Sequence, residues 1–117
     1  MTELESVAAL IRQRGLEWCE IKLKADLLEK DRESYFASLV NELRKADPTA
    51  SEKRLETEAK ASREYRDYVR GETLAKHEAL VAKVKYEAVQ TLFSAKQSDQ
   101  SLLREQVSKG IFHEGGK

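Results

Sequence analysis

Residues 62–107 read SREYRDYVRGETLAKHEALVAKVKYEAVQTLFSAKQSDQSLLREQV and decide the fold, because this stretch predicts one long helix with no proline in it. Reading in sevens gives an apolar row down most of the segment, with a second stripe beside it. The row consists of Leu74, Val81, Ala88, Ala95 and Leu102 with Val84 at the companion position, and the second stripe of Leu80, Val84 and Leu92. Such a helix spans roughly 65 Å at about 1.5 Å per residue, so it must project or find a partner.

Charged pairs and a glycine inside this helix lead to two further predictions. Glu72 with Lys76, and Lys83 with Glu87, are spaced four apart, and we expect both pairs on the solvated side. Gly71 stands alone in helical sequence and predicts the close approach of a neighbouring helix.

Composition favours a single all-α domain. The 117 residues are 40% hydrophobic and 36% charged, and the chain contains one proline and five glycines. The 21 basic and 21 acidic residues cancel, which gives no global attraction to nucleic acid or to an anionic membrane. A single cysteine and the lack of a membrane span or signal peptide predict a cytoplasmic protein.

The first part of the chain predicts a matching helical arm over about residues 3–46. Thr2 and Glu5 form a capping box. Two seam rows then recur in sevens: Leu4, Ile11, Trp18, Ala25, Arg32, Leu39 and Ala46, and Val7, Arg14, Ile21, Leu28, Tyr35 and Glu42. Gly15 beside Arg14, and Arg32, interrupt the pattern and predict a kink or break. Alternation of apolar residues from Leu16 to Ala25 leaves a short strand as the alternative.

Asp47-Pro48 is the one clear break. We expect a short helix over about 48–61, capped by Asp47 or by a Thr49–Glu52 capping box. Ser62 would cap the second arm, residues 62–108, unless residues 51–107 form one continuous helix. Lys109, Gly110 and Ile111 predict the end of this arm, with residues 110–117 as a frayed tail.

These lengths predict an elongated antiparallel helical hairpin with a short connecting helix, assembling into a dimeric bundle because two helices bury little apolar surface alone. We therefore expect a homo-oligomer. The expected helix–helix interface consists of Trp18, Ile21, Leu28, Leu39, Leu74, Val81, Val84 and Leu92.

Residues with catalytic chemistry are few. His77 and His113 lack a second ligand at helical metal-site spacing, and Cys19 beside Trp18 is expected to be a packed thiol. We therefore predict no enzyme activity, no metal and no cofactor.

A basic and aromatic cluster opens the second arm: Arg63, Arg66 and Arg70, with Tyr65 and Tyr68 interleaved. Arginines bind phosphates and tyrosines stack on unpaired bases. Weak, salt-sensitive binding of single-stranded nucleic acid is thus one alternative function; tyrosines packed in a core beside solvated arginines are the other interpretation.

Residues 61–66 (ASREYR) and 77–106, with the core KVKYEA at 83–88 and LLR at 102–104, resemble the closing helix of small helical proteins encoded by bacteriophages and prophages. The resemblance covers residues 61–106 and implies an accessory role in phage DNA recombination or replication. It carries over no functional residue. We therefore expect a non-enzymatic helical interaction protein, with a helix-docking inhibitor or adaptor of a host protein as a further alternative.

Overall fold

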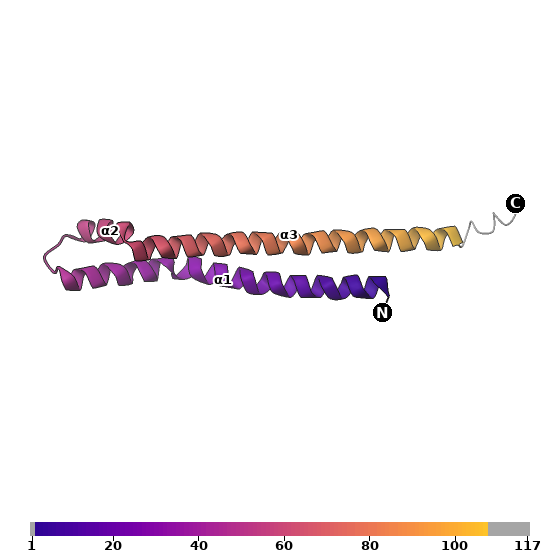
Figure 1. Cartoon of the computed structure of the whole chain (residues 1–117), viewed down its shortest axis with the longest axis horizontal. Coiled ribbons are helices and arrows are strands. Elements are labelled where there is room, and N and C mark those ends of the chain that lie inside the picture. Colours follow the sequence, from indigo (N-terminus) through magenta and orange to yellow (C-terminus); the bar gives the residue numbers. More distant parts are fainter. Residues whose placement is uncertain (1, 108–117) are drawn as a thin grey trace. The chain divides into compact units, whose positions relative to one another are not determined.

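The computed structural model describes residues 2–107 and contains three helices and no strand in that range. They are α1 (Glu3–Ala46), α2 (Glu52–Ala61) and α3 (Arg63–Glu105), shown in chain order in Figure 1. The all-α prediction is confirmed, and the strand alternative at Leu16–Ala25 is wrong because those residues are helical. The predicted end of the second arm at Lys109–Ile111 and the tail 110–117 lie outside the described residues.

Helix α1 begins at the predicted capping box. The backbone N–H of Glu5 donates to the Thr2 hydroxyl, and the N–H of Thr2 donates to the Glu5 carboxylate, both at 3.1 Å. These bonds satisfy two N–H groups that have no partner within the helix. The N–H of Thr2 also lowers the pKa of Glu5, because it stabilises the charged carboxylate.

The corner before α2 differs from the prediction. The carbonyl of Asp47 accepts from the N–H of Ala50 at 3.2 Å, so Pro48 occupies the second position of a turn that suits its fixed φ. Helix α2 begins only at Glu52, with Ser51 as its N-cap: the Ser51 hydroxyl accepts from the N–H of Arg54 at 3.2 Å. The predicted start at residue 48, capped by Asp47 or Thr49, is therefore wrong.

Ser62 separates α2 from α3. Its backbone is extended (φ −69°, ψ 152°), its hydroxyl donates to the carbonyl of Ala59 at 2.6 Å, and the same hydroxyl accepts from the N–H of Tyr65 at 3.2 Å. One side chain thus caps the end of α2 and the start of α3. The predicted N-cap is confirmed, and a continuous helix over residues 51–107 is wrong.

The chain forms two compact units. Unit 1 combines Met1–Trp18 with Ala82–Lys117, of which the structure describes residues 2–18 and 82–107, and unit 2 is Cys19–Val81. Each contains a segment of α1 and a segment of α3, and unit 2 also contains α2.

Unit 2 has two small apolar clusters. In the first, Ala25 of α1 packs with Ala75 and Ala79 of α3, flanked by Ile21 and Leu28. In the second, Leu55 and Ala59 of α2 pack on Val40 of α1. The half-buried residues around this second cluster are Phe36, Leu39, Leu43 and Ala50. Alanines in the first cluster let α1 and α3 approach closely, whereas α2 uses its single fully buried leucine to cover the end of α1.

Aromatic pairs align the two long segments of unit 2. Tyr68 stacks on Tyr35 with ring centroids 4.5 Å apart, and Tyr65 meets Phe36 edge-on at 5.2 Å. The Tyr68 hydroxyl also donates to the carbonyl of Leu28 at 2.6 Å. Residue numbers rise along α1 as they fall along α3 in these and the alanine contacts, so the two segments of unit 2 run antiparallel.

A charged layer lies between the alanine cluster and the aromatic pairs. Arg32 of α1 donates to both carboxylate oxygens of Glu72, at 2.9 and 3.1 Å, and Lys76 contacts Glu72 at 3.0 Å and Glu29 of α1 at 3.2 Å. Glu72 is only 2% exposed. The expectation of a solvated Glu72–Lys76 pair is therefore wrong for Glu72, and Arg32 does not break α1 because it has a buried partner.

Gly15, the other expected break, also lies within an unbroken α1. In unit 1, a Cβ built on Gly15 would stand 3.1 Å from Cε1 of Tyr86, whose ring packs on Trp18 with centroids 5.5 Å apart. The glycine therefore makes room for an aromatic side chain of α3. Nothing lies within 4 Å of a Cβ at Gly71, so the close approach predicted there is wrong.

Candidate interaction surfaces

Several large apolar residues of α3 are exposed rather than packed against α1. In unit 2, Leu74 and Val81 are 56% and 39% exposed, whereas the neighbouring Ala75 and Ala79 are buried. In unit 1, Val84 and Leu92 are 57% and 44% exposed. These residues of the expected seam therefore do not make the contacts with α1. In unit 2, the residues of α3 that face α1 are instead alanines, tyrosines and Glu72.

The expected interface residues of α1 do face α3 or α2. Trp18 packs on Tyr86, Ile21 and Leu28 flank the alanine cluster, and Leu39 flanks the Leu55 cluster. The heptad rows read from Leu4 and Val7 therefore describe the buried side of α1 in each unit.

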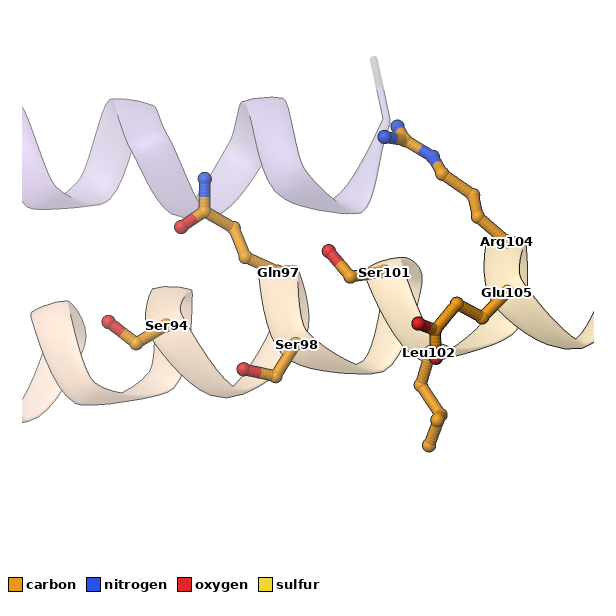
Figure 2. A pocket seen from close by; sticks show the side chains of 7 residues that line it. All are labelled: Ser94, Gln97, Ser98, Ser101, Leu102, Arg104 and Glu105. Atoms are coloured by element: carbon orange, nitrogen blue, oxygen red, sulfur yellow. The ribbon is translucent and has the colours of Figure 1, made fainter.

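In unit 1, five exposed apolar residues of α3 lie along one side of the helix and form a row that we call the outer stripe: Val84, Ala88, Leu92, Ala95 and Leu102. Successive steps of four, four, three and seven residues keep these side chains on one side of a helix. Figure 2 shows the end of this helix, where Leu102 points away from α1 while Gln97 and Arg104 reach toward it. The outer stripe is thus the side of α3 turned away from α1.

The structure brings together only some of the five arginines and tyrosines predicted as a binding face at the start of α3. Tyr65 and Tyr68 are half-buried against α1, whereas Arg63, Arg66 and Arg70 are exposed. Burial is the main cause that raises the pKa of Tyr68, with smaller contributions from the nearby charges of Asp31 and Glu72. Tyr68 is stacked on Tyr35, whereas Tyr65 lines an open groove together with Arg66 and Arg70, so only part of the expected arginine–tyrosine face is brought together.

The exposed side of the same region contains an open groove of about 410 Å³ between α2 and the first turns of α3. Its lining is Lys60 from α2 and Tyr65, Arg66, Val69, Arg70, Thr73 and Leu74 from α3. We call it the α2–α3 groove. Sequence reasoning missed it because the contribution of α2 depends on the corner at Ser62.

Groups with catalytic chemistry are not gathered anywhere in residues 2–107. His77 is exposed, His113 lies outside the described residues, and no group of three or more His, Cys, Asp or Glu side chains in the described part could hold a metal ion. Cys19 is exposed, so the expectation of a packed thiol is wrong. The hollow drawn in Figure 2 is lined only by residues of α3, mainly serines and glutamine.

Across residues 2–107, no helix combines the length and apolar character that crossing a membrane would require. Comparison with protein-family models, curated proteins and solved structures finds no match to this chain.

Proposed function

We propose that this chain is a non-enzymatic helical interaction protein, an antiparallel hairpin that self-associates through the outer stripe of α3. The observation that carries the proposal is the exposure of Val84, Leu92 and Leu102, at 57%, 44% and 55%. Contiguous exposed apolar surface with a regular helical period is typical of an interface between proteins.

The composition of the buried row supports this proposal. In unit 2 the residues of α3 that face α1 include two alanines, two tyrosines and a glutamate, while Leu74, Leu80 and Val81 are exposed. Each large apolar side chain covered on association contributes about 1.5–3 kcal/mol, so the exposed apolar side chains of α3 can stabilise an oligomer. A second copy brings the same stripe and can cover it isologously.

The test compares two double variants by sedimentation equilibrium. Val84→Glu with Leu92→Glu places two charges on the outer stripe, and we expect the dissociation constant of the oligomer to rise at least tenfold because the carboxylates would have to be desolvated. Ser94→Glu with Ser101→Glu is the matched control: it adds the same charge to exposed positions of the same helix that lie about a quarter turn around the helix from the stripe. All four side chains are exposed in the single chain, so helicity by circular dichroism should not change.

Unchanged association of the Val84→Glu, Leu92→Glu variant would contradict the assignment of the stripe. Equal weakening by the serine control would show a general charge effect instead.

An accessory role in phage DNA recombination or replication rests on the resemblance of residues 61–106 alone. Affinity capture from infected host cells, followed by mass spectrometry, tests it: recombination or replication proteins should be enriched, and their absence among reproducible partners would count against the role.

A further inference from the structure

The α2–α3 groove has the geometry of a helix-binding surface. Tyr65, Val69 and Thr73 form one row with a spacing of four, and Arg66, Arg70 and Leu74 form the next. Rows with this spacing are the ridges of a helix surface, and the groove between two of them receives the side-chain ridge of another helix. Lys60 of α2 adds one end wall. The groove therefore fits a helical segment better than a flat or branched ligand.

The residues that line the groove are complementary to a helix that has an apolar ridge flanked by acidic side chains. Val69 is half-buried and Leu74 is 56% exposed, so apolar carbon lines the groove beside the tyrosine. The groove is also lined by three cationic side chains, those of Lys60, Arg66 and Arg70. None of the three makes a hydrogen bond or an ion pair within residues 2–107.

Nearby arginines show the contrast. Arg54 pairs with Glu58 at 3.1 Å, and Arg63 pairs with Asp67 at 3.7 Å. Glu58 and Asp67 are thus already paired with other arginines, and the three cations of the groove remain for an outside anion.

The chain's own outward apolar residues match this groove poorly. Leu23 and Leu27 of α1 are exposed but have neighbours of both signs, among them Glu20, Lys24 and Asp26, and the outer stripe of unit 1 likewise adjoins both Lys85 and Glu87. A second copy would bring mixed charges to a surface that has three unpaired cations, whereas a uniformly acidic helix would bring only opposite charges. The occupant is therefore a different protein.

Nucleic acid is the competing occupant, and the aromatic contacts disfavour it. Base stacking needs a free ring face. Tyr65 is engaged edge-on by Phe36 and Tyr68 is stacked on Tyr35. The groove lining thus joins one partly engaged ring, Tyr65, to aliphatic carbon and arginines, which suits leucine and glutamate side chains better than unpaired bases.

We propose that the α2–α3 groove binds an acidic amphipathic helix of a partner protein, its apolar ridge lying between the Val69 and Arg70 rows and its carboxylates facing Lys60, Arg66 and Arg70. This is a surface separate from the outer stripe of unit 1. Helix-in-groove binding of this kind is a common mode of peptide recognition.

The test uses a fluorescein-labelled 18-residue peptide with leucine at every third or fourth position and glutamate beside each leucine, measured by fluorescence anisotropy against the full chain at low and at physiological salt. The same peptide with lysine in place of glutamate, and a labelled single-stranded oligonucleotide, are the competing probes. We expect the glutamate peptide to bind, to gain helicity on binding, and to weaken as salt increases. The lysine peptide should bind at least tenfold more weakly.

Two variants locate the surface. Arg66→Gln with Arg70→Gln removes two unpaired cations, and Leu74→Ser removes exposed apolar surface; each should weaken peptide binding at least tenfold. Arg12→Gln with Arg104→Gln is the control, because it removes the same charge from two exposed arginines elsewhere. The Val84→Glu, Leu92→Glu variant should bind the peptide like the unchanged chain, which keeps this proposal separate from self-association.

Failure of the glutamate peptide to bind, or equal binding of the lysine peptide, would overturn the proposal. Tighter binding of the oligonucleotide that depends on Arg66 and Arg70 would overturn it in favour of a nucleic-acid surface.

Discussion

Glu72 is a charged side chain in a row of alanines and tyrosines, and its burial depends on Arg32. The guanidinium donates to both carboxylate oxygens, while Lys76 contacts the same carboxylate from the next turn of α3. A buried carboxylate without such partners is strongly destabilising, whereas the complete pair contributes little net stability. The pair therefore favours one register of α1 against α3 more than it adds to the free energy of unfolding.

Replacing Arg32 by alanine should destabilise the chain by about 2 kcal/mol. Breaking a buried ion pair costs roughly 3–5 kcal/mol, and we expect less here because the Arg32 side chain is 40% exposed and Lys76 remains. Urea denaturation followed by circular dichroism measures the change. Arg32→Met combined with Glu72→Leu should restore most of the lost stability. If the free energy of unfolding of Arg32→Ala lies within about 0.5 kcal/mol of the unchanged chain, which is the range typical of surface substitutions, the pair is not buried as described.

We predict that the folded chain loses stability at alkaline pH because the phenol of Tyr68 ionises. Its pKa is raised, so the folded state holds the phenol proton more tightly than the unfolded state does. The contribution of this proton is fully present below the unfolded pKa, about 10, and is lost as the pH rises through the higher folded pKa. Tyr68→Phe removes the hydrogen bond to the Leu28 carbonyl and should cost about 1 kcal/mol at neutral pH.

The Tyr68 effect is checked by urea denaturation between pH 8 and pH 11. Lys76, whose pKa is raised by its hydrogen bonds to Glu72 and then Glu29, contributes to alkaline loss in both proteins. The difference in unfolding free energy between the unchanged chain and Tyr68→Phe should therefore shrink as the pH rises. A constant difference over that range would contradict the raised pKa.

The two interior glycines should respond differently to alanine. Gly71 has open space around it, so Gly71→Ala should stabilise the chain by about 1 kcal/mol through helix propensity. Gly15→Ala should gain less or lose stability, because its Cβ would lie 3.1 Å from a Tyr86 ring that is also packed on Trp18. Thermal denaturation of both variants measures the contrast, and an equal gain for both would argue against the Gly15–Tyr86 contact.

At the scale of the helices, the sequence predicted α1 and α3 well because long runs without proline and with strong helix formers leave few alternatives. The breaks expected at Gly15 and Arg32 were wrong because both residues have partners on α3, and such partners are invisible from local propensity. The start of α2 was misplaced because two weaker cap signals precede Ser51.

The candidate surfaces were harder to predict than the helices. A search for large apolar residues at a spacing of seven selects Leu74 and Val81, yet a close helix pair buries alanines and leaves such side chains outside. The same search found the buried side of α1 because its large apolar residues, such as Ile21 and Leu28, do flank the contact. Tyrosines at the start of α3 were ambiguous until Tyr35 and Phe36 were placed opposite them.

At the scale of the whole molecule, charge does not oppose self-association. The formal net charge is zero, so two copies meet without a general electrostatic penalty. Exposed leucines and valines occur in both units, including Leu16 and Val84 in unit 1 and Leu23 and Leu74 in unit 2. Association is therefore expected from the balance of a thin interior and ample apolar surface.

In the proposed oligomer a second copy covers the outer stripe, so the molar mass in solution should exceed that of one chain. Light scattering coupled to size-exclusion chromatography, over loading concentrations from about 1 to 100 μM, should give a mass at least twice that of one chain at the upper end and a decrease on dilution. A constant mass equal to one chain across the whole range would contradict the account.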